Sequence, residues 1–270
     1  MSESGQVQCT VVRQLWSRRH APASTSAHAT PGNIGLFHWR DLADLDCTEK
    51  TCSLLPAPCS RGTAIRDLAS RLRRLPPSCG PVRLIGVDGH AGSGKSTFVS
   101  QLARELDGAP VLRLDDLASH AELFGWTERL LTQVIEPLGR GETARYTPYD
   151  WHTRRFGPPR PLPPAPVVLV EGVGAGRRAL RPHLAHLLWM ELPREEAWAR
   201  GRARDGKEQR EFWDGWVRAE QRHFAEDPSR PFADLLVRQC AEGYEVLSGP
   251  AGSIGPNQNI TQGDGPSAVC

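Results

Sequence analysis

The stretch GVDGHAGSGKST, residues 86–97, combines residue types that can bind a nucleoside triphosphate. Residues 89–96 fit the pattern G-x-x-x-x-G-K-[ST], in which glycines let backbone N–H groups approach a phosphate closely. Lys95 is expected to reach the β- and γ-phosphates, and the Ser96 hydroxyl can be a ligand of Mg²⁺. The motif predicts that ATP is bound by Gly89, His90, Ala91, Gly92, Ser93, Gly94, Lys95, Ser96 and Thr97.

Carboxylates follow two apolar runs further along the chain. Asp115 and Asp116 end the run APVLRLDD, and Glu171 comes directly after VVLV. Because the carboxyl ends of parallel strands face the ligand crevice, these groups are expected near the triphosphate. One aspartate would deprotonate an attacking hydroxyl, and Glu171 would hold Mg²⁺. The alternatives are that Asp116 caps the next helix and that Glu171 is a structural carboxylate.

The segment TPYDWHTRRFG gathers aromatic, acidic and basic side chains in one loop. Tyr149 and Trp151 offer rings that can stack on a base. Asp150 can accept hydrogen bonds from sugar hydroxyls, and Arg154 or Arg155 can contact phosphate. The alternative is a packed, proline-stiffened loop with solvated charges. With Asp116 added, the expected substrate-binding residues are Asp116, Tyr149, Asp150, Trp151 and Arg154.

The elements that must position these groups alternate between strand and helix. Short apolar runs predict strands at residues 81–89, 109–116, 167–170 and 186–193. Helical spacing of apolar residues predicts helices at residues 63–75, 95–108, 121–138 and 194–224. This alternation predicts an α/β fold of the three-layer P-loop NTPase kind, with a parallel sheet covered by helices on both faces.

Composition limits the class of protein. The chain has 270 residues and a net charge of +2, which is too near neutral to indicate a nucleic-acid or membrane-surface partner. We find no apolar run near the ~20 residues that a membrane helix needs. The seven cysteines form no CxxC pair, which favours a reducing cytoplasm. We expect a cytoplasmic protein with a small-molecule substrate, and self-association stays open.

Residues 1–60 and 246–270 are rich in small and polar residue types. Such segments bury too little apolar surface to order themselves, so both are expected to be disordered. The domain that binds the nucleotide is therefore expected at residues 61–245.

The order and approximate spacing of GVDGHAGSGKST, RLDD, PYDWHTRR and VVLVEG resemble those of the uridine kinase family. This family comprises nucleoside kinases related to phosphoribulokinase and bacterial pantothenate kinase, and the resemblance covers about residues 63–240. It implies that Asp115 is the general base, that Glu171 is the magnesium carboxylate, and that Tyr149 and Asp150 belong to the nucleoside-binding loop.

The family also carries arginines on a mobile lid helix, and the segment RGRARD, residues 200–205, resembles it. The resemblance therefore implies a lid around residues 194–210. Arg200 and Arg204 are one helical turn apart, so both can face the phosphates. The alternative is a solvated, arginine-rich helix face. The expected catalytic residues are Asp115, Lys95, Arg204 and Arg200.

The resemblance implies transfer of the γ-phosphate of ATP to the 5′-hydroxyl of uridine or cytidine, with Mg²⁺ as cofactor. Two departures fall on the acceptor side. Leu-Ala follows Asp116 where the family has Phe-Tyr, and Arg154 stands where the family has a histidine. A kinase of another small alcohol, such as pantothenate or a sugar, stays open, as does a P-loop ATPase or regulatory module.

Overall fold

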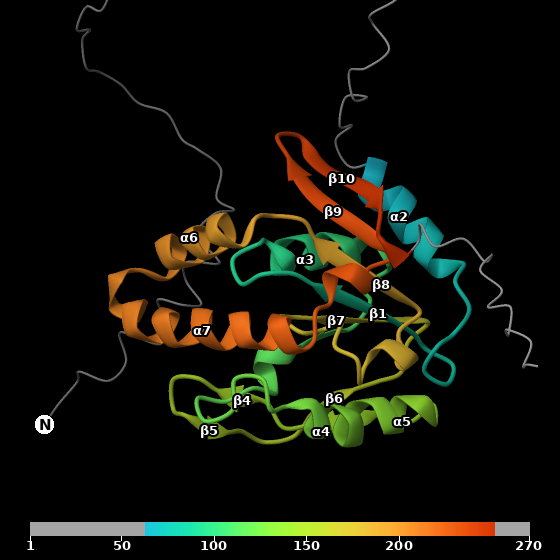
Figure 1. Ribbon diagram of the computed structural model, residues 1–270. Helices are drawn as coiled ribbons and strands as arrows, with labels where there is room; N and C mark the ends of the chain where they lie inside the picture. Colours follow the sequence, from blue (N-terminus) through green and yellow to red (C-terminus); the bar gives the residue numbers. More distant parts are fainter. Residues whose placement is uncertain (1–62, 252–270) are drawn as a thin grey trace, which may run out of the picture. The chain divides into compact units, whose positions relative to one another are not determined.

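The computed structural model describes residues 63–251, and the segments expected to be disordered lie largely outside the described residues. A six-stranded sheet forms the centre, in the order β10-β9-β8-β1-β7-β2 (Figure 1). Its strands are β1 (Arg83–Asp88), β2 (Val111–Arg113), β7 (Val167–Glu171), β8 (His186–Met190), β9 (Leu235–Cys240) and β10 (Gly243–Ser248). Neighbours from β2 to β9 pair in parallel, and β10 pairs antiparallel with β9.

Each face of the sheet has its own hydrophobic core, because side chains alternate along a strand. On β1, Ile85 packs into one core and Leu84 into the other; on β7, Leu169 and Val170 divide in the same way. The first core includes the helices α2 (Thr63–Arg73) and α3 (Lys95–Glu105). The second core includes the helical segment 127–139, which lies below the sheet in Figure 1. The predicted three-layer α/β fold is confirmed.

The helix expected at residues 121–138 begins only at Thr127. It consists of α4 (Thr127–Leu130), a π-helical stretch (Leu131–Ile135) and α5 (Glu136–Gly139). Pro137 has no N–H for the regular bond, and its ring crowds the carbonyl four residues earlier. The π-helical stretch ends at Ile135, two residues before Pro137, so the regular bonding pattern changes close to the proline.

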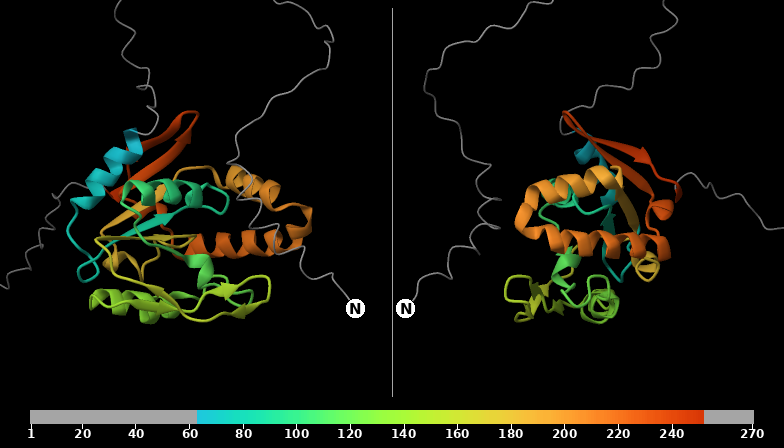
Figure 2. Two further views of the ribbon diagram at one scale, coloured as in Figure 1. Left: turned by 180° about the vertical axis from the view of Figure 1, so that it is seen from behind. Right: turned by 60° about the vertical axis from the view of Figure 1, so that its left-hand side comes forward.

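Two predicted elements are shorter than expected at the carboxyl edge of the sheet. The strand expected at residues 109–116 ends with β2, and Leu114–Asp116 form a 3₁₀ turn. The helix expected at residues 194–224 is divided into α6 (Arg194–Asp205), a 3₁₀ turn (Lys207–Gln209) and α7 (Arg210–Glu226). Gly206, with φ of 87°, makes the break, because a positive φ cannot continue a helix. The two helices lie side by side at one end of the sheet in all three views (Figures 1 and 2).

Several elements were not predicted. They are two hairpins, β3 (Ala144–Tyr146) with β6 (Arg160–Leu162) and β4 (Tyr149–Asp150) with β5 (Arg155–Phe156), the strands β9 and β10, and 3₁₀ turns at Arg181–His183 and Arg230–Phe232. Strand β10 continues to Ser248, so ordered structure extends past the boundary predicted at residue 245.

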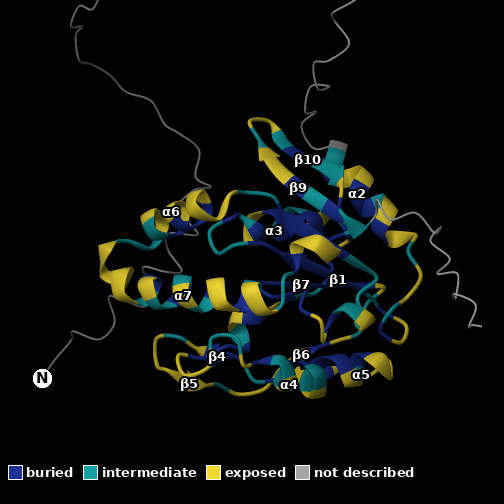
Figure 3. Ribbon diagram, in the orientation of Figure 1, coloured by how far each residue is buried: buried dark blue, intermediate teal, exposed yellow. Residues whose placement is uncertain are grey.

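The buried centre and the exposed periphery differ clearly by element. Figure 3 shows β1 and β7 as largely buried, whereas the outer faces of α6 and α7 are exposed. Among residues 63–251, each helix is too short or too polar to cross a bilayer.

Candidate active site

The predicted phosphate-binding loop connects β1 to α3, as its motif requires. Gly89, Gly92 and Gly94 all have positive φ values, of 143°, 85° and 93°, so the loop depends on glycine at these positions. Lys95 is buried at the start of α3, and its Nζ donates to the backbone oxygens of Gly89 (2.8 Å) and His90 (2.9 Å). The loop therefore has the curled backbone and the lysine that a triphosphate needs, at the positive end of a helix.

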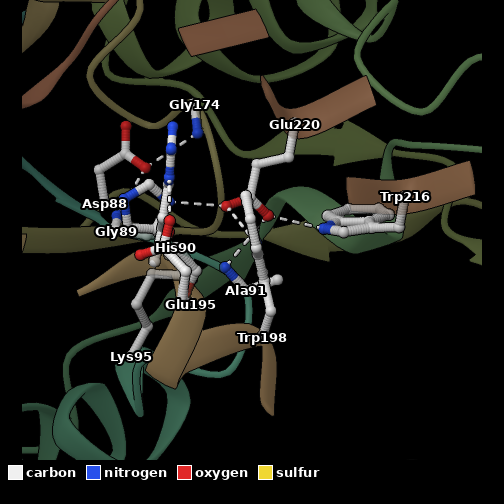
Figure 4. Close-up of polar contacts among 11 residues, drawn as sticks. Asp88, Gly89, His90, Ala91, Lys95, Gly174, Glu195, Trp198, Trp216 and Glu220 are labelled. Atoms are coloured by element: carbon white, nitrogen blue, oxygen red, sulfur yellow. Dashed lines mark hydrogen bonds and ion pairs between the residues drawn. The ribbon is translucent and has the colours of Figure 1, made fainter. Parts of the chain in front are cut away.

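Asp88, the last residue of β1, holds this loop to the loop that follows β7. Its buried carboxylate accepts hydrogen bonds from the backbone N–H groups of Gly89 (2.7 Å), Gly174 (2.9 Å) and Gly176 (2.8 Å). Figure 4 shows Asp88 beside Gly89 and Gly174. The motifs of the sequence did not predict this role, although an aspartate at the end of a buried strand is itself a signal.

Glu171, the last residue of β7, lies directly beside the phosphate-binding loop. The Ser96 hydroxyl donates to its carboxylate, 3.0 Å from Oε1 and 3.2 Å from Oε2. Burial and the nearby carboxylate of Asp115 raise the pKa of Glu171, while Lys95, Ser96 and Arg113 act in the opposite direction. Burial disfavours the charged form of this carboxylate, so a cation bound beside it would stabilise that form.

The donor set at this point fits a magnesium ion. A serine hydroxyl and a glutamate carboxylate are hard oxygen ligands, and they are already in hydrogen-bond contact. Within residues 63–251 no group of three His, Cys, Asp or Glu side chains is arranged as a protein metal cage. Mg²⁺ in kinases does not need one, because substrate phosphates and water complete its coordination. Ser96 and Glu171 are thus the residues that would hold it.

Asp115 lies in the 3₁₀ turn after β2, on the same edge of the sheet. Its side chain is exposed, but surrounding protein atoms remove part of its hydration, and this raises its pKa. The positive charges of Lys95, Arg113 and Arg204 lower the pKa, whereas Asp116 raises it further. The structure therefore brings Asp115 within electrostatic range of both Lys95 and Glu171.

Asp116, its neighbour, belongs to a different environment. Its carboxylate accepts a hydrogen bond from the Tyr146 hydroxyl (3.3 Å) and feels the charge of Arg160. Burial raises the pKa of Asp116 despite these partners. Tyr146 and Arg160 are paired residues of the β3–β6 hairpin, so Asp116 connects the sheet edge to this hairpin.

The expected substrate-binding loop is the β4–β5 hairpin and its turn. Tyr149 is buried, and its hydroxyl lies 3.0 Å from Nδ1 of His120. Trp151 Nε1 donates to the backbone oxygen of Asp115 (3.0 Å), which ties this loop to the 3₁₀ turn. The rings of Tyr149 and Trp151 are 5.2 Å apart and edge-on, and His120 lies against both. The aromatic residues therefore pack together beside Asp115.

Asp150 and Arg154 lie at the exposed turn of the same hairpin. The Asp150 carboxylate accepts hydrogen bonds from the backbone N–H groups of His152 (2.8 Å) and Thr153 (3.0 Å). Arg154 has a φ of 56°, which is unusual for a residue other than glycine. Asp150 helps define the turn through its side chain and Arg154 through its backbone, and whether they also bind a substrate stays a prediction.

The two expected lid arginines differ in their surroundings. Arg200 pairs with Glu196 on its own helix, Nη2 to Oε1 2.6 Å. Arg204 forms a two-pronged pair with Asp205, with distances of 2.6 and 2.9 Å, and its charge reaches Asp115. Of the two, Arg204 is the one whose charge acts on Asp115.

Among solved structures, two chains described as kinases are similar to part of this chain. No protein-family model and no curated protein matches the chain significantly. The structure is similar to a "possible uridine kinase" from Bacillus stearothermophilus, with a TM-score of 0.48 and 20% identity over 64% of this chain and 96% of that one. It is also similar to a "putative fructose transport system kinase" from a Silicibacter species, with a TM-score of 0.43 and 22% identity over 52% and 80% of the two chains. Such values leave the reaction to be argued from the residues of this chain.

Proposed function

We propose that this protein is an ATP-dependent phosphotransferase that moves the γ-phosphate of ATP to an alcohol group of a small molecule. The observation that carries the proposal is Asp115, an exposed carboxylate within electrostatic range of Lys95 and Glu171. Lys95, Ser96 and Glu171 would take part in binding the nucleotide and its metal. A further carboxylate at this point, open to solvent, is what an acceptor hydroxyl requires.

In this proposal the acceptor oxygen attacks the γ-phosphorus, the bond to the bridging β–γ oxygen breaks, and ADP leaves. Asp115 orients the acceptor hydroxyl and takes its proton. Its raised pKa suits this role, because a base works best when its pKa approaches the working pH. Lys95 and Arg204 stabilise the negative charge of the transferring group. Bound at Ser96 and Glu171, Mg²⁺ would neutralise charge on the phosphates.

For the acceptor we propose a nucleoside, with the 5′-hydroxyl of uridine or cytidine as the reacting group. Tyr149, Trp151 and His120 offer aromatic surface near Asp115, on which a base can stack. The family resemblance points the same way, and the departures at Arg154 and after Asp116 keep pantothenate and sugars as alternatives. A cytoplasmic location and self-association stay predictions.

The test is ADP formation by the purified full chain with Mg²⁺ and ATP. The panel of acceptors contains uridine, cytidine, other nucleosides, pantothenate and simple sugars, and mass spectrometry identifies the phosphorylated product. Lys95→Ala should abolish the reaction, whereas Arg74→Ala, at an exposed position of the turn after α2, should not change it.

Each result has a distinct meaning. Turnover with uridine or cytidine supports the whole proposal, and turnover with another alcohol alone changes only the acceptor. Slow ATP hydrolysis that no acceptor stimulates would overturn the phosphotransferase and favour a nucleotide-binding module.

A further inference from the structure

Glu220 is fully buried in the middle of α7, and its carboxylate accepts four hydrogen bonds (Figure 4). Two come from the phosphate-binding loop: Nδ1 of His90 at 2.8 Å and the backbone N–H of Ala91 at 3.2 Å. The other two come from indole groups, Nε1 of Trp198 on α6 at 3.0 Å and Nε1 of Trp216 on α7 at 2.8 Å. One side chain therefore joins the loop to both helices.

The environment of Glu220 keeps it ionised. Burial on its own would raise its pKa, but the hydrogen bond from His90, the charge of Lys95 and the hydrogen bond from Trp216 more than offset this, so the pKa is lowered. An ionised carboxylate only accepts hydrogen bonds and has about four lone-pair positions, which matches four donors. Facing this carboxylate, Nδ1 of His90 must carry a proton.

A second contact, independent of Glu220, presses α6 against the same loop. A Cβ atom added to Gly92 would lie 2.0 Å from the backbone oxygen of Ala197 and 2.8 Å from the backbone nitrogen of Gly201, both on α6. A Cβ added to Gly201 would lie 2.2 Å from the ring of Trp213 on α7. The loop, α6 and α7 thus meet without space for a methyl group at either contact.

We infer that Glu220 is a positioning residue of the nucleotide site. Its carboxylate fixes α6 and α7 to the phosphate-binding loop, so the two helices form a fixed wall of the site rather than a lid that opens as one body. Motion of the kind expected for a lid is then confined to the turn at Gly206 and to exposed side chains such as Arg204. This inference needs the nucleotide-binding half of the proposed function and is independent of the acceptor.

A positioning role and a simple charge effect of Glu220 predict opposite changes in nucleotide affinity when Glu220 is substituted. Glu220 is negative and lies within electrostatic range of Lys95, so its charge on its own disfavours a bound triphosphate. Removing only the charge would therefore strengthen nucleotide binding. In Glu220→Gln, however, the amide nitrogen faces N–H donors, so the network breaks and the loop loses its support. If Glu220 positions the loop, the substitution weakens binding.

The experiment compares Glu220→Gln with Glu226→Gln in the full chain. Both substitutions change the same residue type on α7, but Glu226 is exposed. The affinity for the magnesium complex of a non-hydrolysable ATP analogue is measured by calorimetry, at a temperature where circular dichroism shows each variant folded. We expect Glu220→Gln to bind the analogue at least about tenfold more weakly than the parent, and Glu226→Gln to bind it with unchanged affinity.

A folded Glu220→Gln variant that binds the analogue as tightly as the parent, or more tightly, would overturn the inference. A merely structural Glu220 gives this result, with a lowered melting temperature and unchanged affinity below it. If Glu220→Gln does not fold, hydrogen exchange of the parent decides. The analogue should then protect α6 and α7 together with residues 89–97, and protection of the loop alone would contradict the inference.

The same measurements separate this inference from the proposed function. A parent that binds the analogue but phosphorylates no acceptor disproves the phosphotransferase and leaves the role of Glu220 intact. A parent that phosphorylates an acceptor, combined with unchanged binding in Glu220→Gln, disproves the inference alone.

Discussion

The proposed nucleotide side and the proposed acceptor side of the candidate site hold their polar groups in different ways. On the nucleotide side, the buried carboxylates of Asp88 and Glu220 each accept hydrogen bonds from several segments of the chain. On the acceptor side, the exposed carboxylate of Asp150 accepts them from the backbone of its own turn. A carboxylate bonded to distant segments fixes those segments, whereas one bonded locally fixes only a turn.

The difference shows which part of the chemistry this fold fixes. Asp115 and Asp116 stand at the boundary, since Asp115 feels the charges of Lys95 and Arg204 whereas Asp116 contacts Tyr146. On the nucleotide side, one buried carboxylate holds several segments at once. A single substitution there should therefore have a large effect. The acceptor side depends on a short hairpin and packed aromatic rings, so substitutions there should change acceptor affinity modestly and leave nucleotide binding intact.

The largest effect on nucleotide affinity is expected for Gly92→Ala. The new methyl group would clash with the backbone of α6, and the alanine would have to adopt a φ of 85°. Nucleotide affinity should therefore fall by about a hundredfold. Gly108→Ala is the matched control, because Gly108 has a φ of 78° with nothing within 4 Å of its Cβ position. Calorimetry with the ATP analogue measures both variants. Equal affinities would show that the contact of Gly92 with α6 does not matter.

An intermediate effect is expected for Glu171→Gln, with opposite signs for binding and stability. Loss of the carboxylate should weaken Mg²⁺-dependent ATP binding by about tenfold. Because the pKa of Glu171 is raised in the folded state, its stabilising contribution is complete only at low pH and is lost as the pH rises through the folded pKa. The neutral amide should therefore raise the melting temperature of the ligand-free protein at neutral pH, by about 2–4 °C.

The check on Glu171→Gln is a pair of melting curves without magnesium. The gain should be present at neutral pH and should disappear below the pKa of an unfolded glutamate, about 4.3. Glu128→Gln, an exposed position on α4, serves as the control and should shift neither curve. A lower melting temperature at neutral pH would mean that the ionised carboxylate stabilises the fold.

The smallest effect is expected for Tyr149→Phe. The substitution removes the hydroxyl that meets His120 but keeps the ring among Trp151 and Phe156. We expect the KM for the acceptor to rise by about two- to fivefold, as for a single neutral hydrogen bond, with unchanged KM for ATP. Steady-state kinetics with each substrate varied in turn gives both values. A change confined to ATP would place Tyr149 on the nucleotide side.

The phosphate-binding loop could be predicted because its residues are contiguous and its function depends on backbone shape. The carboxylates at the strand ends, Asp115 and Glu171, could be proposed because the strands before them are short apolar runs. Glu220 could not, since its partner His90 is 130 positions away and the sequence around Glu220 looks like an ordinary amphipathic helix. Contacts between distant elements leave no local signal.

The predicted boundaries of helices and strands were wrong where local backbone conformation interrupts a continuous sequence pattern. The pattern of residues 194–224 predicts one helix, but Gly206 divides it and thereby lets α7 return along α6. The run at residues 109–116 predicts a strand to its end, but the last residues curl into a 3₁₀ turn. That turn gives Asp115 and Asp116 different environments, a difference that strand periodicity does not predict.

The most direct test of the central claim is the rate of acceptor-dependent ADP formation by Asp115→Asn at saturating Mg²⁺ and ATP. If Asp115 serves the acceptor and not the nucleotide, this rate falls by about 10²- to 10⁴-fold relative to the parent, while half-saturation by ATP stays unchanged. A rate within a few-fold of that of the parent would contradict the claim, because the acceptor proton would then leave by another route.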